Sequence, residues 1–248
     1  MEGYGPETYG ERFADVYDEW YADVSDVEAT VSYLRELAGA GPVLELGVGT
    51  GRIASRLVSP ELTVVGLDAS PAMLARLSST PEGRTVIAIQ GDMATPSVTA
   101  PHGPYRLIFV AFNTFFNIAD ADSQRASLAE IAELLGPEGR FVLEGFVLDT
   151  DHDEPTQAVE AASITADRVI LRVSRHNPSD QTITGQHVDI TEAGIRLRPW
   201  HLRYATPDEL DDMAYSAGLV LEGRFADWNS QPFGPTSTTH VSVYQRRS

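Results

Sequence analysis

The chain of 248 residues contains no cysteine and no lysine, so all 18 of its basic side chains are arginine. Without cysteine it has no disulfide, no thiolate zinc site and no cysteine nucleophile. Without lysine it has neither a Schiff-base lysine nor the lysine of a phosphate-binding P-loop. His176, His187 and the acidic residues of 149–154 could in principle hold a metal, but their spacing matches no standard site, so we expect no bound metal.

Long hydrophobic runs and an excess of positive charge are also missing. No apolar run approaches the roughly 18 residues of a membrane span, and residues 1–5 lack the basic and apolar segments of a signal peptide. We therefore expect a soluble protein of the cytoplasm. A net charge of −18 would repel nucleic acids and anionic membranes. The expected partner is a small molecule, neutral or cationic.

A glycine-rich turn is the most informative feature that is present. Residues 43–52 form an apolar strand that runs into a G-x-G-x-G turn at Gly47, Gly49 and Gly51. Glycines let the backbone bend tightly and approach a ligand, which a β-carbon would prevent. Because residues 53–58 have helical spacing, the turn delivers its ligand to a helix N-terminus.

Acidic residues follow the next two predicted strands. The strand at 63–67 leads into Asp68, which can accept hydrogen bonds from both hydroxyls of a ribose. The strand at 85–90 leads into Asp92, which would bind an adenine amino group, and Met93, which would pack on the adenine ring. Together with the glycine turn, these residues predict a cofactor of the adenosine type.

The turn itself favours S-adenosylmethionine over a dinucleotide. A pyrophosphate requires G-x-G-x-x-G, but here the third glycine comes one place early and Arg52 stands in its position. Glu45, two places ahead of the turn, suits the ammonium of a methionine moiety and would repel a pyrophosphate. We therefore predict S-adenosylmethionine as the cofactor. An NAD-dependent oxidoreductase is the less favoured alternative.

Several segments of the chain resemble the class I S-adenosylmethionine-dependent methyltransferases. These are residues 43–52, 67–74, 91–93 and 134–141. Residues 13–18 and 111–117 resemble, within that family, small-molecule methyltransferases that include the sugar-amine N-methyltransferases of antibiotic pathways. The resemblance implies in-line transfer of a methyl group to O, N or C of an aromatic or sugar-like acceptor of secondary metabolism. A non-catalytic partner subunit that only binds the cofactor is the other interpretation left open.

The order of the predicted elements indicates an α/β fold. Repeated strand–helix units predict a Rossmann-like, doubly wound, seven-stranded and mostly parallel sheet, with ligands at the carboxyl ends of its strands. Period-two alternation over 165–205 predicts an inserted antiparallel meander of three strands. This insertion would wall the active site or pair two subunits into a homodimer. We expect one compact unit, with a helical lid at 1–38 and a methyltransferase domain at 39–248.

Aromatic residues recur at four-residue intervals in the predicted lid. Tyr9, Phe13, Tyr17 and Tyr21 would form one stripe on a helix. This stripe either docks on the core or covers the cofactor, and the resemblance implies that Tyr17 contacts the cofactor. The full set of cofactor-binding candidates is Tyr17, Tyr21, Glu45, Gly47, Gly49, Gly51, Arg52, Asp68, Ala69, Met73, Asp92, Met93 and Phe112.

We expect the molecule that accepts the methyl group to bind next to the residues that follow the fourth predicted strand. Residues 113–117 lack the prolines of the Asn/Asp-Pro-Pro-aromatic motif, which speaks against nucleobases and glutamine as acceptors. The substrate-binding candidates are Asn113, Phe116, Asn117, Arg203 and His240. Histidine has a suitable pKa for a general base, and the catalytic candidates are His152, His201 and Tyr204. Arg203 and Tyr204 would either orient the substrate or pair with surface acids.

Overall fold

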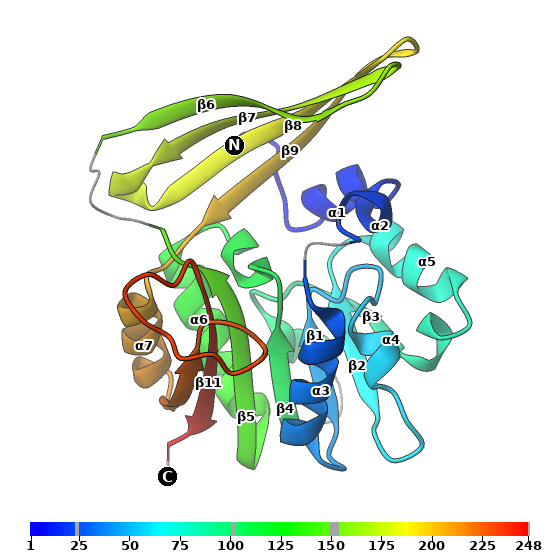
Figure 1. The fold of residues 1–248 in the computed structure, drawn as a ribbon. Helices are drawn as coiled ribbons and strands as arrows, with labels where there is room; N and C mark the ends of the chain where they lie inside the picture. The colour runs from blue at the N-terminus through cyan, green and yellow to red at the C-terminus, as the bar shows by residue number, and fades with distance from the viewer. Residues whose placement is uncertain (23–24, 101–102, 149–153, 248) are drawn as a thin grey trace.

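Two β-sheets lie one above the other in the computed structural model, which describes residues 1–22, 25–100, 103–148 and 154–247 (Figure 1). The larger sheet has seven strands in the order β10-β11-β5-β4-β1-β2-β3. Only β11 runs against its neighbours. The prediction of a seven-stranded, mostly parallel sheet is therefore confirmed. Its strands are β1 (Val43–Leu46), β2 (Val64–Asp68), β3 (Ile87–Gln90), β4 (Tyr105–Val110), β5 (Leu135–Phe146), β10 (Leu219–Phe225) and β11 (Thr239–Arg246).

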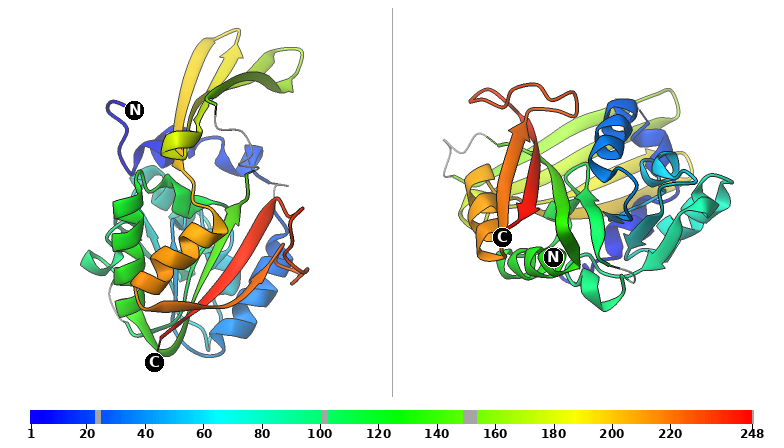
Figure 2. Two further views of the ribbon diagram at one scale, coloured as in Figure 1. Left: turned by 90° about the vertical axis from the view of Figure 1, so that its left-hand side faces the viewer. Right: turned by 90° about the horizontal axis from the view of Figure 1, so that it is seen from below.

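Helices cover both faces of this sheet, which explains why β1 and β4 are mostly apolar and almost entirely buried (Figure 2). On one face lie α6 (Ala121–Leu134) and α7 (Pro207–Ser216), and on the other lie α3 (Val27–Ala38) and α4 (Ala54–Leu57). Ser70 caps α5 (Pro71–Ser79), since its Oγ accepts the N–H of Met73 at 3.2 Å. Thr206 caps α7 in the same way. The described helices include none that is long and apolar enough to cross a membrane.

The second sheet is antiparallel and contains one strand more than expected. It runs in the order β6-β7-β8-β9, formed by β6 (Thr156–Ile164), β7 (Arg168–Asn177), β8 (Thr182–Thr191) and β9 (Gly194–Arg203). The last three strands are the predicted meander. Strand β6 escaped prediction because three of its nine residues are alanine, which has low strand propensity. It is an exposed edge strand, stabilised by its pairing with β7.

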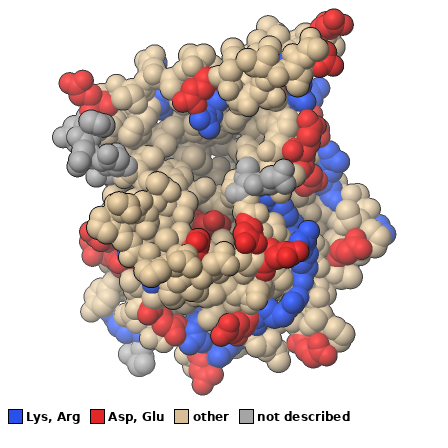
Figure 3. Space-filling model, in the orientation of Figure 1, with Lys and Arg blue, Asp and Glu red and all other residues tan. Residues whose placement is uncertain are grey.

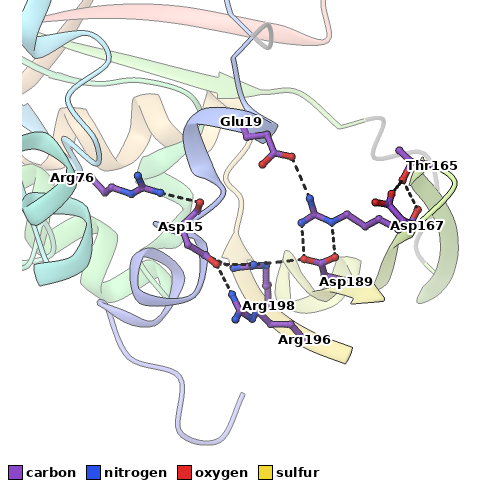
Figure 4. Close-up of polar contacts among 9 residues, drawn as sticks. Asp15, Glu19, Arg76, Thr165, Asp167, Asp189, Arg196 and Arg198 are labelled. Atoms are coloured by element: carbon purple, nitrogen blue, oxygen red, sulfur yellow. Dashed lines mark hydrogen bonds and ion pairs between the residues drawn. The ribbon is translucent and has the colours of Figure 1, made fainter. Parts of the chain in front are cut away.

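The N-terminal aromatic stripe is divided between two short helices, α1 (Thr8–Phe13) and α2 (Tyr17–Trp20), which lie between α5 and the second sheet. Ion pairs attach them to that sheet (Figure 4). Asp15 binds Arg198 at 2.6 Å and also binds Arg196. Arg76 of α5 donates to the main-chain oxygen of Asp15 at 2.9 Å. The segment is therefore held by contacts on both of its sides. That residues 1–38 act as a lid over the domain at 39–248 stays a prediction.

Cofactor site and acceptor side

A cavity of about 270 Å³ lies where the carboxyl ends of β1, β2, β3 and β4 meet the N-terminal segment. It is placed where an open α/β sheet binds ligands. Nine of the predicted residues line it, namely Tyr17, Gly47, Gly49, Asp68, Ala69, Met73, Asp92, Met93 and Asn117. Residues spread over 100 positions of the chain are thus brought to one cavity.

The three glycines of the turn have different roles. All three have positive φ, at +70° for Gly47, +55° for Gly49 and +82° for Gly51. A β-carbon on Gly47 would come within 2.3 Å of Thr114 Cγ2, and one on Gly51 within 2.1 Å of Leu77 Cδ1. A β-carbon on Gly49 would meet no protein atom within 4 Å. Glycine at positions 47 and 51 therefore lets Thr114 and Leu77 pack against the turn, whereas glycine at position 49 leaves open space at the cavity wall.

Asp68 is held in place by the backbone around it. Its Oδ2 accepts the N–H of Gly49 and its Oδ1 accepts the N–H of Ser70, both at 2.8 Å. Burial raises the pKa of this carboxyl, and the two hydrogen bonds oppose that shift. Each oxygen keeps a lone pair for a ligand hydroxyl, so the residue fits a ribose. Asp92 is fixed similarly, because its Oδ1 accepts the N–H of Ala94 at 2.8 Å.

Glu45 lies in the core at the end of β1, only 5% exposed. Its Oε2 has no hydrogen-bond partner in the described part of the chain. Burial raises the pKa of this carboxyl well above its usual range, although Arg52 and the backbone of Ala54 act in the opposite direction. Glu45 does not line the cavity itself. A buried acid with a free oxygen beside the turn suits the ammonium group of S-adenosylmethionine, so the residues present fit this cofactor.

Arg52 connects the lid to the end of β4. It donates to the main-chain oxygen of Tyr21, and its guanidinium lies 5.4 Å from the centroid of the Phe112 ring. The rings of Tyr21 and Phe112 are 5.8 Å apart. None of the three is among the residues that line the cavity. Direct contact of Arg52, Tyr21 and Phe112 with the cofactor therefore remains a prediction.

The turn after β4 has an unusual backbone. Phe112 and Asn113 are consecutive non-glycine residues in the left-handed region, with φ of 54° and 62°. Glu144 of β5 supports this turn, because its Oε2 accepts the N–H of Phe112 at 2.6 Å. No motif in the sequence marks Glu144 for this role. The amide oxygens of Asn113 and Asn117 are buried and have no partner among the described residues.

Two of the catalytic candidates, His201 and Tyr204, lie outside the cavity wall. The ring of His201 packs 6.2 Å from that of Tyr4, which lines the cavity, and its Nδ1 lies 3.0 Å from Thr184 Oγ1. Burial lowers the pKa of His201. The hydroxyl of Tyr204 lies 2.9 Å from Nε2 of His176. His152 lies outside the described residues.

Three acceptor candidates belong to the core instead. Arg203 is buried, donates to Gln124 at 2.9 Å and pairs with Glu209. His240 is fully buried beside Ser242, and burial lowers its pKa to about 4. Phe116 is fully buried, with its ring 5.0 Å from that of Phe146. We therefore no longer assign Arg203 and Phe116 to acceptor binding, because internal partners already occupy their side chains. The Nε2 of His240 has no hydrogen-bond partner among the described residues, so a role of His240 in acceptor binding stays a prediction.

Sequence reasoning also missed part of the cavity wall. The additional lining residues include Tyr4, Gly5 and Pro6, which precede every motif, and Ile118, Ala119 and Ser123 after β4. Nothing in their local sequence marks them as ligand contacts. They reach the cavity only because the chain folds back over the sheet edge.

This fold and cavity define a protein that binds an adenosine-type cofactor at the carboxyl edge of a parallel sheet. The chain matches the model of a methyltransferase domain over residues 43–139. It is 37% identical to the CcbJ methyltransferase of Streptomyces caelestis, with a TM-score of 0.89 over 99% of this chain and 100% of that one. It is 27% identical over 252 residues to the cypemycin N-terminal methyltransferase of a Streptomyces species, covering 98% of this chain and 99% of that protein.

A third relative shares the fold. The amino pentose methyltransferase CalS10 of Micromonospora echinaspora, involved in calicheamicin biosynthesis, is 20% identical, with a TM-score of 0.67 over 99% of both chains. The chain belongs to the class I S-adenosylmethionine-dependent methyltransferases. Its cofactor is S-adenosylmethionine, which sets aside the dinucleotide alternative.

Proposed function

We propose that this methyltransferase modifies an amine nitrogen of an aromatic or sugar-like small molecule of secondary metabolism. The observation that carries the proposal is the pair of buried amide oxygens of Asn113 and Asn117, which have no partner within the described chain. A buried acceptor atom without a hydrogen bond is costly, so these oxygens favour a ligand that donates hydrogen bonds, from an amine N–H or a hydroxyl O–H. Asn117 lines the cofactor cavity, and Asn113 precedes it on the same turn.

The names of relatives support nitrogen as the acceptor atom. One is an N-terminal methyltransferase, and another, 28% identical over 145 residues, is a glycine/sarcosine N-methyltransferase of Halorhodospira halochloris. Cypemycin and calicheamicin appear in the names of relatives, which favours secondary metabolism for this chain. A cytoplasmic location and the exclusion of nucleic acid and membrane partners stay predictions from composition.

The chain contributes mainly positioning to the reaction. When bound, S-adenosylmethionine supplies a methyl group on a positively charged sulfur. Asp68 and Asp92 would hold its nucleoside, and Tyr17, which also lines the cavity, would cover it. Asn113 and Asn117 would align the amine with the methyl carbon. Such alignment can supply ~7–11 kcal/mol of barrier reduction, and a neutral amine needs no further activation.

A panel of matched acceptors tests this proposal. We expect methylated products, detected by mass spectrometry, from amino sugars or aromatic amines and none from the corresponding alcohols. Below the pKa of the acceptor amine, the rate should rise about tenfold per pH unit, because only the free base reacts. Asn113→Leu should raise KM for the amine, whereas Asn229→Leu, on an exposed loop, should not. Products from alcohols alone would contradict the proposal.

We also propose that the outer face of the second sheet binds a second copy of this chain. Val159, Ile164, Ile195 and Leu197 are 69%, 71%, 68% and 52% exposed. The strand register places all four on one face. In the described strands this face carries no Asp or Glu, although the chain has a net charge of −18. Like-charged copies would repel each other least across such a face.

Light scattering during size exclusion measures this association. We expect a dimer for the wild type and a monomer for Leu197→Glu. The control Val98→Glu, at another exposed apolar position that is 76% exposed, should remain dimeric. A monomeric wild type would contradict the proposal.

A further inference from the structure

The turn that follows β4 has a backbone conformation that its sequence disfavours. The N–H of Thr114 donates to the main-chain oxygen of Ala111 at 3.1 Å and closes the turn. Both central residues, Phe112 and Asn113, have positive φ, as in a type I′ turn, where glycine, asparagine and aspartate predominate. Asparagine tolerates this region, whereas a bulky side chain such as phenylalanine rarely adopts it. Phe112 is therefore the strained residue of the turn.

A side chain of the neighbouring strand holds this strained residue. Such strain persists only where the surroundings fix the backbone. The parallel pairing of β4 with β5 ends at Val110 and Leu143. The next residue of β5 is Glu144, and its Oε2 accepts the N–H of Phe112 at 2.6 Å. The N–H of Phe112, beyond the last paired residues of the sheet, thus finds its acceptor in a carboxyl group.

The residues after this turn form part of the cofactor cavity. Thr114 and Asn117 line it, and Nδ2 of Asn117 donates to the main-chain oxygen of Thr114 at 3.1 Å. Thr114 also packs against Gly47, where a β-carbon would come within 2.3 Å of its Cγ2. Asn113 has a buried amide oxygen without a partner among the described residues. The turn therefore sets the position of both the cavity wall and Asn113.

Glu144 lies near the site without lining it. Among the described residues, it is not one of those that form the cavity wall. Burial raises the pKa of its carboxyl, and the hydrogen bond from Phe112 opposes that shift. The carboxyl ends of the parallel strands face the second sheet in Figure 1, and the molecule is hollowed between the two sheets on the face that Figure 3 draws. Glu144 can therefore act on the site through the turn.

We propose that Glu144 is a positioning residue that holds the strained turn at Phe112 and thereby places Asn113 for the acceptor and Thr114 for the cofactor. This inference rests on the proposed function in one respect, namely that Asn113 contacts the acceptor. The place of Thr114 in the cavity wall does not depend on that contact. Without an acceptor for its N–H, Phe112 should relax to negative φ, and the residues after it should move away from the cavity.

Glu144→Leu and Glu144→Gln distinguish positioning from a direct action of the charge. Leucine removes the hydrogen-bond acceptor, whereas glutamine keeps a carbonyl oxygen without the charge. For Glu144→Leu we expect Kd for S-adenosylhomocysteine to rise about fivefold and KM for the acceptor about tenfold, the usual effect of losing one hydrogen bond. Glu144→Gln should stay within about twofold of the wild type in both values. Calorimetry measures Kd, and KM is determined with whichever amine or alcohol of the acceptor panel is methylated.

Phe112→Gly tests the strain itself, since glycine adopts positive φ readily. In the Phe112→Gly background, adding Glu144→Leu should change Kd for S-adenosylhomocysteine by less than about twofold. This comparison keeps the test informative if Glu144→Leu alone fails to fold. Glu222→Leu is the matched control, because Glu222 pairs with Arg140 of β5 at the surface and is 36% exposed. It should keep the Kd and KM of the wild type.

Unchanged Kd and KM in Glu144→Leu would overturn the positioning role, and so would equal losses in Glu144→Leu and Glu144→Gln. A loss that persists in full in the Phe112→Gly background would also overturn it. The amine proposal fails separately, in the product assay. If Kd and KM change as expected but only alcohols are methylated, the positioning role stands and the proposed function falls. If amines are methylated while Glu144→Leu keeps the wild-type Kd and KM, the reverse holds.

Discussion

Gly49→Val is expected to abolish binding of S-adenosylmethionine while the chain still folds. The β-carbon at this position meets no protein atom within 4 Å, so the valine methyl groups would occupy the cavity of about 270 Å³. We expect Kd to rise about 100-fold or more, near the upper end of the ~1–3 kcal/mol that overpacking costs. Calorimetric titration with the cofactor measures the change, and a thermal melt checks that the fold persists.

Gly51→Ala provides the contrast within the same turn. Its β-carbon would collide with Leu77 Cδ1 at 2.1 Å, and its φ is +82°. A side chain in the left-handed region costs roughly 1–2 kcal/mol by itself. Gly49→Val shares that backbone cost, since its φ is +55°. Both variants should therefore lose some stability, and the Gly51 variant should lose more because of the collision with Leu77, but only the Gly49 variant should lose affinity. If Gly49→Val bound S-adenosylmethionine with the Kd of the wild type, the turn would not approach the cofactor.

The parts of the site that could be predicted share one property, which is that their evidence is local in the sequence. Gly49 and Asp68 each lie where a buried strand ends, so their position on the sheet edge follows from the strand itself. The Ser70 cap and the following Pro71 indicate the start of α5 for the same reason. Strand periodicity likewise located three strands of the second sheet, whereas β6 carries no such pattern.

The parts that could not be predicted depend on partners distant in the chain. Glu144 gains its role from the N–H of Phe112, 32 residues earlier. From the sequence, Arg203 was expected either to orient the substrate or to pair with surface acids. Its partner Gln124 lies 79 residues earlier, on α6. No periodicity or motif predicts such pairings. A polar residue that has a distant partner in the core can therefore be mistaken for a substrate-binding residue.

Arg203→Met is expected to destabilise the protein by about 3–5 kcal/mol, the usual cost of removing one partner from a buried ion pair. The Arg203 side chain is only 8% exposed and pairs with Glu209, which is 23% exposed. Its other guanidinium nitrogen donates to Gln124 at 2.9 Å. Removing the arginine would leave the Glu209 carboxylate with Gln181 but without a positive charge. Chemical denaturation measures the loss of unfolding free energy.

Arg196→Met is the matched control, because Arg196 pairs with Asp15 at the surface and is 64% exposed. Exposed pairs contribute about 0–1 kcal/mol, so this variant should unfold almost like the wild type. If Arg203 serves the fold alone, KM for the amine acceptor should stay unchanged in the Arg203 variant below its unfolding transition. A raised KM with unaltered stability would return Arg203 to the acceptor site. The two measurements together separate a residue that connects β9 to α6 and α7 from one that recognises substrate.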